Sequence, residues 1–471
     1  MTEDTKYKAT IGLEIHAELK TQTKMFCACK NDPDEEKPNS NICEICTAQP
    51  GTLPVLNKKA IEHVLRVGLA CGSKIADFTE WDRKNYFYPD IPKGYQISQY
   101  KYPLVLGGSI KGVELTRIHL EEDTGSSTHD SGNFSLVNFN RAGVPLMELV
   151  TEPVIHSGKQ AAEFARELQL LLQYLGAGDA NMEKGEMRVE ANISVSDTDK
   201  LGTKVEIKNL NSFRTVERAV AYEIERQIDA IEKGEKVVQE TRGWDEAKQK
   251  TFSQRLKESS HDYRYFPDPD LPKMIVSEVF DLKDLKAKLP ELPWERREKY
   301  LKKFDIKEQD AEFFVNNTDF GNFFEKVISY FKDNKDLIKL ASNYISSDMV
   351  GIMTKDATLK YPAPEQFSKI ILMVKDGKIS SRVAKDLVER LLKENIDPEE
   401  VANREGLMQK NDEGAVKEIA NKLIAENPKV VADYKAGKEM ALMFFVGQIM
   451  KATKGSSNPQ VIKKVLVDLL S

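Results

Sequence analysis

The residues best suited to bind a metal ion alternate along one short segment near the start of the chain. Within residues 11–19, Glu14, His16 and Glu18 occupy every second position. The alternate positions are all apolar: Ile11, Leu13, Ile15, Ala17 and Leu19. Successive side chains of a β-strand point to opposite faces, so the alternation predicts a strand with one apolar face and one polar face. Two carboxylates and an imidazole on the polar face could hold a divalent cation. A solvated edge strand is the alternative.

Four of the five cysteines lie close together and predict a second metal site. Cys27 and Cys29 form one arm, and Cys43 and Cys46 form a Cys-x-x-Cys arm beyond a polar loop. Four thiolates at this spacing can bind one tetrahedral Zn²⁺, which would be structural because no coordination position stays open. Four unlinked thiols are the alternative. Cys71 lies in an apolar-patterned segment, and we expect it to be a buried core residue.

Two later segments supply further carboxylates. A predicted strand at residues 113–122 ends in Glu121 and Glu122, and the pleat sends these two side chains to opposite faces. Only one of them should therefore face a shared pocket. Glu148 interrupts an apolar strand, where an unpaired carboxylate would be costly to bury, so we expect a partner such as a metal or Arg141. The alternative is that Glu148 lies at the end of its strand and its carboxylate reaches water.

Hydrophobic periodicity predicts the elements that must position these residues. Apolar residues at helical spacing predict helices at residues 57–71, 159–175 and 213–232. Strands with one apolar and one charged face are predicted at residues 188–195 and 204–208. Because strands and helices do not alternate strictly, this order predicts an α+β domain built on a mostly antiparallel sheet. The polar face of such a sheet could hold a highly charged ligand.

From about residue 294 the pattern becomes helical. We predict three parts: a sheet-based cradle domain at residues 1–293, an all-α linker domain at 294–355 and a C-terminal helical tail domain at 356–471. The candidate helices are residues 319–332, 335–354, 364–376, 381–395, 398–404, 413–426, 428–452 and 459–470. Residues 429–471 carry seven lysines against three acids, which would suit contact with a phosphate backbone. A lysine-covered, solvated helical bundle is the alternative.

Charge and composition narrow the class of protein. The chain has 471 residues, with 69 basic and 75 acidic side chains, so any surface for nucleic acid must be local. No run of 18 apolar residues is present, and the first residues lack the apolar stretch of a signal peptide. We therefore expect a cytoplasmic protein without membrane contact. Neither of the standard glycine-rich nucleotide-binding motifs occurs.

Several segments resemble the B subunit of the glutamyl/aspartyl-tRNA amidotransferases, in order and over nearly the whole chain. These segments are residues 11–16, 50–57, 82–90, 96–99, 119–123, 140–143, 206–212, 262–267, 445–448 and 458–459. The resemblance implies a heterotrimer with an amidase A subunit and a small C subunit. It also implies ATP-dependent conversion of misacylated Glu-tRNA(Gln) or Asp-tRNA(Asn) into Gln-tRNA(Gln) or Asn-tRNA(Asn). In that reaction this subunit would phosphorylate the tRNA-linked carboxylate with ATP and Mg²⁺, and ammonia from the A subunit would displace the phosphate.

The resemblance also implies roles for individual residues. The metal-binding and catalytic role falls on Glu14, His16, Glu122 and Glu148, with Glu121 as their neighbour. Lys84 matches a lysine near the mouth of the ammonia channel, where a cation could guide ammonia or order the substrate. The contacts to phosphate or to the acceptor end fall on Arg141, Arg188, Lys208 and Asn209.

The four cysteines resemble a zinc knuckle that only some family members have. The expectation that zinc is bound therefore rests mainly on the spacing of the cysteines. The rival hypothesis is a non-catalytic, zinc-containing RNA-binding adaptor in which the acidic residues are merely structural.

Overall fold

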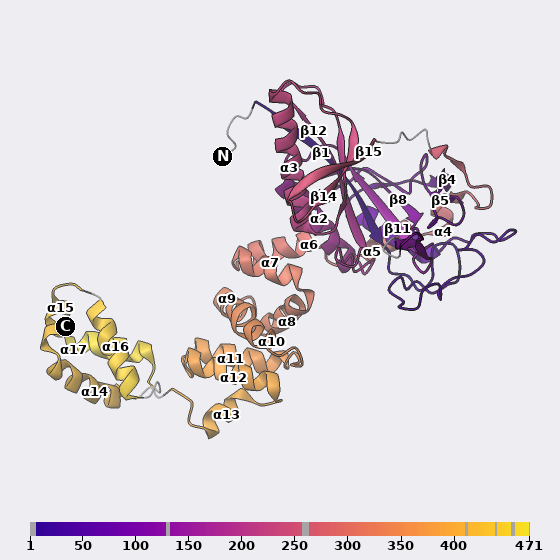
Figure 1. Cartoon of the computed structure of the whole chain (residues 1–471). Coiled ribbons are helices and arrows are strands. Elements are labelled where there is room, and N and C mark those ends of the chain that lie inside the picture. Colours follow the sequence, from indigo (N-terminus) through magenta and orange to yellow (C-terminus); the bar gives the residue numbers. More distant parts are fainter. Residues whose placement is uncertain are drawn as a thin grey trace. The chain divides into compact units, whose positions relative to one another are not determined.

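The structure is a computed structural model that describes residues 6–128, 132–256, 263–409, 413–438, 440–453 and 457–470. Asp262, Glu439 and Lys454 belong to segments discussed above and lie outside these ranges. The chain divides into two compact units, Met1–Pro293 and Trp294–Ser471 (Figure 1). The first unit contains a sheet with helices, and the second is helical. The predicted α+β fold is therefore confirmed.

The first unit is built on a ten-stranded sheet whose main path has the order β15-β14-β13-β12-β1-β11-β8-β6-β2, with β7 paired to β8. Its strands are β1 Lys8–Glu18, β2 Lys74–Ile75, β6 Val105–Leu106, β7 Ser109–Ile110, β8 Val113–Glu122, β11 Pro145–Thr151, β12 Met187–Ser196, β13 Val205–Leu210, β14 Glu240–Asp245 and β15 Lys250–Leu256. The pair β13–β14 is parallel, and the other adjacent pairs are antiparallel. The sheet is thus mixed but mostly antiparallel.

Strand β1 lies at the centre of this sheet and has the two faces that its sequence predicts. Ile11, Leu13 and Ile15 are at most 1% exposed because their face is covered by the core. On the other face His16 pairs with Glu148 of β11 and with Arg188 of β12, and Glu148 pairs in turn with His119 of β8. Directly paired residues share a face, so these four polar side chains form one row across four strands.

Three amphipathic helices pack against this sheet and confirm the helices predicted in the first unit. They are α1 Lys58–Ala70, α2 Gly158–Tyr174 and α3 Phe213–Glu232. Each begins after a side chain that accepts hydrogen bonds from the first turn: Asn57, Ser157 and Ser212. Helix α3 packs on β12, β13 and β15, and α1 packs on β2, β6 and β8. Figure 1 shows α2 and α3 beside the central strands.

Helix α2 starts at Gly158, where α3 leaves no room for a side chain. A Cβ atom there would lie 2.2 Å from the backbone oxygen of Glu217. Gly158→Ala should therefore force the two helices apart and destabilise the first unit by about 1–3 kcal/mol. Thermal unfolding of the first unit measures this loss. Lys159→Ala, an exposed neighbour, should leave the midpoint close to wild type. A wild-type midpoint for Gly158→Ala would contradict the prediction.

Three smaller sheets and two short helices complete the regular elements described for the first unit. One three-stranded sheet has the order β16-β4-β5, and two further pairs are β10-β9 and β17-β3. Their bounds are β3 Phe78–Thr79, β4 Asp82–Asn85, β5 Tyr95–Ser98, β9 Ser126–Thr128, β10 Leu136–Asn138, β16 Phe266–Pro267 and β17 Met274–Ile275. Two short helices follow, α4 Val276–Val279 and α5 Leu282–Ala287.

The second unit consists of helices. Its described α-helices are α6 Pro293–Glu298, α7 Glu308–Asn316, α8 Thr318–Ile328, α9 Lys335–Asn343, α10 Val350–Met353, α11 Pro364–Lys375, α12 Ser381–Lys393, α13 Pro398–Arg404, α14 Glu413–Glu426, α15 Pro428–Lys435, α16 Met440–Ala452 and α17 Pro459–Leu470. Between them lie the π-helices η2 Lys299–Lys303 and η4 Tyr344–Met349 and the 3-10 helix η3 Ser329–Phe331. Helix α11 packs on α8 and α9, so packing continues across residue 355, where the sequence placed a boundary. Helices α14, α16 and α17 share a separate core that includes Val416, Phe445 and Leu466.

The prediction of a single helix at residues 428–452 is wrong. The structure has two helices there, α15 and α16, because the chain turns after Lys435. Gly437 has φ +88°, a conformation that glycine adopts readily and that ends a helix. Among the described residues, no helix is long and apolar enough to cross a membrane.

Candidate functional site

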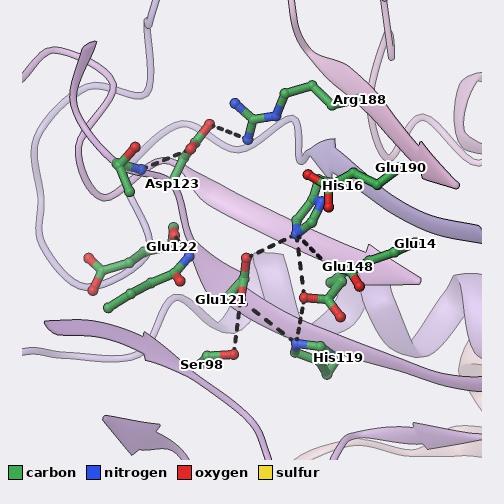
Figure 2. A network of polar contacts seen from close by, with 12 residues as sticks. Glu14, His16, Ser98, His119, Glu121, Glu122, Asp123, Glu148, Arg188 and Glu190 are labelled. Carbon is green, nitrogen blue, oxygen red and sulfur yellow. Dashed lines mark hydrogen bonds and ion pairs between the residues drawn. The ribbon is translucent and has the colours of Figure 1, made fainter. Parts of the chain in front are cut away.

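Two imidazoles and three carboxylates converge on the polar face of the sheet, and we call them the acidic cluster (Figure 2). His16 Nε2 lies 4.0 Å from a carboxylate oxygen of Glu14, 3.5 Å from one of Glu121 and 3.4 Å from one of Glu148. His119 Nε2 lies 3.7 Å from Glu121 and 3.4 Å from Glu148. Glu148 therefore contacts both imidazoles. Strands β1, β8 and β11 supply all five side chains.

The structure brings Glu14, His16 and Glu148 together, but it places Glu121 rather than Glu122 beside them. Glu122 lies on the other side of β8, where its carboxylate accepts a hydrogen bond from the Ile97 backbone N–H at 2.9 Å and pairs with Lys93. Figure 2 shows Glu122 directed away from His16. The pleat separates the two glutamates as expected, and the position proposed for Glu122 is taken by Glu121.

His119 is the member of the cluster that sequence reasoning did not single out, and Glu121 was expected only as a neighbour. They lie two residues apart on β8 and so share a face, which is a sequence signal that they belong together but does not show which face they occupy. The Ser98 hydroxyl donates a hydrogen bond to Glu121 at 2.9 Å and fixes its carboxylate. His119 Nδ1 is buried and has no hydrogen-bond partner within the described part of the chain.

The charges of the cluster shift one another's pKa values. Burial alone would lower the pKa of His16, but Glu148, Glu121 and Glu14 raise it to about 9. Burial would also lower the pKa of His119, but Glu148 and Glu121 outweigh this effect and raise the pKa to about 9. The two histidines in return hold the pKa of Glu148 well below its usual range despite burial. Burial and the nearby Glu148 raise the pKa of Glu14 to about 7.

In the absence of a divalent cation, both imidazoles should therefore stay protonated up to about pH 9. A group whose pKa is raised by folding stabilises the folded state fully at pH values below its pKa in the unfolded chain. This contribution is lost as the pH rises through its pKa in the folded protein. The stability of the first unit should thus fall between pH 6.5 and 9 for the two histidines. Glu14 adds a loss between pH 4.5 and 7. NMR titration of the imidazole signals measures the shifts, and midpoints near 6.5 would refute them.

The two arginines of the predicted phosphate site share one carboxylate next to the cluster. Asp123 lies 3.0 Å from Arg188 Nη2 and 3.4 Å from Arg141 Nε. Arg141 also donates to the Thr124 carbonyl at 3.2 Å. Glu148 is paired with the two histidines and with Arg117 at 3.4 Å, so Arg141 is not the partner that the sequence suggested for it.

Lys208 and Asn209 lie on β13, and Lys84 lies on β4. Lys208 of β13 pairs with Glu190 at 2.8 Å; burial disfavours its charge, but Glu190 and Glu206 raise its pKa overall. Asn209 on the same strand is exposed and has φ +60°. Lys84 of β4 lies over the rings of Tyr86 and Tyr263, 5.8 and 5.2 Å from their centroids. Burial disfavours its charge as well, but Glu121 raises its pKa well above the ordinary value.

The four cysteines form a compact group, as their spacing predicts. Their sulfurs all lie within 4.8 Å of one another, and those of Cys43 and Cys46 are 3.9 Å apart. Four sulfurs bound to one Zn²⁺ at about 2.3 Å would be roughly 3.8 Å apart, so the geometry fits a zinc ion. The Cys27 thiol, the Cys43 backbone and Lys24 together lower the pKa of Cys46 to about 5 despite partial burial. Cys71 is buried, as expected.

The sheet-based unit and most of the helical unit each match a protein family. Residues 9–280 match the family described as the GatB/GatE catalytic domain, and residues 322–470 match the GatB domain. The acidic cluster and the cysteines lie within the first match.

Comparison with curated proteins gives the same result in more detail. The chain is 44% identical to the B subunit of the aspartyl/glutamyl-tRNA(Asn/Gln) amidotransferase of Caldicellulosiruptor saccharolyticus, with 98% of each chain covered. It is 43% identical to the protein of the same name from Thermoanaerobacter pseudethanolicus, over 99% of this chain and 100% of that one. The chain belongs to the family of aspartyl/glutamyl-tRNA(Asn/Gln) amidotransferase B subunits.

Proposed function

We propose that the chain is the subunit of a tRNA-dependent amidotransferase that activates a tRNA-linked side-chain carboxylate with ATP and joins it to ammonia. The substrate would be Glu-tRNA(Gln), Asp-tRNA(Asn) or both, as the relatives' names indicate. The single observation that carries the proposal is the convergence of the acidic cluster on one face of the sheet. A carboxylate resists attack by ammonia, and phosphorylation gives it a leaving group.

The donor set of the acidic cluster fits Mg²⁺. Glu14, His16 and Glu148 form one group with ligand atoms within 4.8 Å, and His119, Glu121 and Glu148 form a second. Carboxylate oxygens are the ligands that magnesium prefers. When bound, the ion would offset the negative charge of phosphates that meet a carboxylate. The two imidazoles would lose their protons to make room for it, because a metal competes with protons for the same ligands.

The chain's own cations would position the anionic substrates. Arg141 and Arg188 are held by Asp123 on the side of the cluster where β8 ends, and their guanidinium groups can bind phosphate in a forked geometry. Lys208 and Asn209 extend the charged face along β13. Glu121 favours the charged form of Lys84 despite burial, and we assign this lysine to ammonia or substrate positioning.

We assign Zn²⁺ to Cys27, Cys29, Cys43 and Cys46, as a structural ion that fixes a polar loop. The partners that follow from the proposal are a glutaminase A subunit, a small C subunit and misacylated tRNA. The helical second unit would contact the tRNA, and the reaction would take place in the cytoplasm.

The direct test measures ATP use by the assembled enzyme. Misacylated tRNA together with Mg²⁺ should stimulate ADP formation, and uncharged tRNA should not. An adaptor without catalytic activity would show no such stimulation, and this result would overturn the proposal while leaving the family assignment intact.

Substitution of the two consecutive glutamates separates their roles. Glu121→Gln should lower ADP formation strongly, because the carboxylate lies 3.5 Å from His16 and 3.7 Å from His119. Glu122→Gln should have a smaller effect, because Glu122 contacts Ile97 and Lys93 outside the cluster. Steady-state kinetics at saturating Mg²⁺ compare the two. The assignment fails if Glu122→Gln is the more damaging change.

A further inference from the structure

A lysine whose side chain is completely buried lies between the cysteine site and the loop that carries Arg141. Lys24 is 0% exposed, although lysine is almost never fully buried unless its charge has partners. Its Nζ donates to the Phe139 carbonyl at 3.1 Å and lies 4.0 Å from the Cys46 sulfur. The ammonium group therefore joins a thiol of one site to the backbone of the neighbouring loop.

The contacts around Lys24 lead directly to the end of β8. Gly143 has φ +84°, and a Cβ atom there would lie 3.6 Å from Lys24 Cδ, 3.8 Å from Cys46 Cβ and 3.9 Å from Glu122 Oε2. These side chains therefore meet around one glycine. Glu122 and Cys46 also line the same small cavity, together with Asp123.

Further hydrogen bonds join the segment that contains Lys24 and the cysteines to residues 139–143. The Met25 N–H donates to the Gly143 carbonyl at 2.7 Å. The buried Asn140 side chain accepts from the Ser40 and Asn41 N–H groups at 2.9 and 3.0 Å and donates to the Lys37 carbonyl at 2.8 Å. Residues 139–143 are thus held by the loop that the cysteines close.

Residues 139–143 carry a group of the proposed phosphate site. The Arg141 guanidinium pairs with Asp123, whose backbone carbonyl accepts from the Gly143 N–H at 2.9 Å. A shift of this loop would move Arg141 and Asp123 together. An ammonium group next to metal-bound thiolates is also favourable, because it offsets the excess negative charge of a four-thiolate zinc site.

From these contacts we infer that Lys24 is a positioning residue that couples the zinc-loaded cysteine site to the loop of Arg141. The inference rests on the proposed function for the phosphate role of Arg141 and on the assignment of zinc. Its structural part can be tested without measuring activity: loss of the Lys24 charge, or of the metal, should loosen residues 139–143.

The test compares Lys24→Met with Lys30→Met in the full chain. Lys30 follows Cys29 in the same loop, but its side chain is 67% exposed and pairs only with Asp32 at 2.7 Å among the described residues. Zinc affinity is measured by chelator competition, and hydrogen exchange reports on residues 139–143. Lys24→Met should weaken zinc binding about 10- to 100-fold, as expected for loss of a group next to the ligands. It should also speed exchange at residues 139–143, and Lys30→Met should do neither.

Wild-type enzyme stripped of zinc by a selective chelator, with Mg²⁺ in excess, provides a second measurement if Lys24→Met does not fold. Exchange at residues 139–143 should rise and return to its original rate on addition of zinc. In the assembled enzyme the KM for ATP should rise in Lys24→Met more than kcat falls, because Arg141 is displaced and the acidic cluster is not.

Each other outcome overturns the inference. Unchanged zinc affinity and exchange in a folded Lys24→Met chain show that the lysine couples nothing. A loss of zinc affinity with unchanged exchange reduces Lys24 to a local part of the cysteine site. A wild-type chain that binds no zinc removes the partner that Lys24 needs, and ADP formation then still decides the proposed function separately.

Discussion

Glu148→Gln should lower the rate of magnesium-dependent ADP formation about 10²- to 10³-fold, the loss typical of removing one preorganised polar group. Substitution of Glu148 has the largest expected effect on activity, because its carboxylate lies 3.4 Å from both His16 and His119 and belongs to both candidate ligand groups. The amide is a weaker ligand for Mg²⁺, and in the metal-free cluster it cannot balance two buried imidazolium groups. The measurement is ADP formation by the assembled enzyme with misacylated tRNA.

The control for Glu148→Gln is Glu114→Gln, an exposed position on β8 of the same sheet, which should keep wild-type activity. Binding of tRNA to Glu148→Gln should stay within a few-fold of wild type, since Glu148 is only 5% exposed. Retained ADP formation in Glu148→Gln would show that the acidic cluster is not the site of activation.

Truncation of the chain after Gln409 should produce the second large effect, a loss of tRNA affinity. The cut removes all four helices α14–α17, because α14, α16 and α17 share one core and a shorter deletion would expose Val416 and Ala420. Each lost lysine–phosphate contact should also reduce the slope of log affinity against log salt concentration by about 1. Filter binding over a range of salt concentrations measures both quantities.

The imidazole titrations provide the control for the truncated chain. His16 and His119 lie in the first unit, so their raised pKa values should be the same as in the full chain. If the truncated chain bound tRNA with unchanged affinity and unchanged salt dependence, the second unit would have no role in RNA binding.

The elements with a continuous apolar pattern could be predicted from the sequence. Strand β1 keeps one phase of alternation through Ile11, Leu13 and Ile15, and these residues are all in the core. The helices α1, α2 and α3 were predictable for the same reason, since a wide apolar stripe and a capping residue define each of them. Burial of a long apolar face is a local property of the sequence.

The orientation of Glu121 and Glu122 could not be predicted because β8 changes phase. Val113 and Leu115 are buried in one alternation, whereas Ile118 and Leu120 are buried in the other. The apolar pattern therefore does not determine which glutamate shares a face with His16. The pairing of β8 with β11, where Glu148 lies opposite His119, determines which glutamate faces the cluster. The pairing of strands that are distant in the chain cannot be read from a single sequence.

The partners of the arginines depend in the same way on tertiary contacts. Arg141 and Arg188 meet at Asp123 although 65 residues separate Arg188 from that carboxylate. The residues of the proposed phosphate site could be selected from the sequence by type, but which of them share a carboxylate could not.

The row of paired residues across β12, β1, β11 and β8 limits how the length of this chain can change during evolution. One residue inserted into β1, β8 or β11 would turn the rest of that strand over and move its member of the acidic cluster into the apolar layer. Related sequences should therefore differ in length only in the connections, such as residues 197–204, and keep the lengths of these three strands fixed.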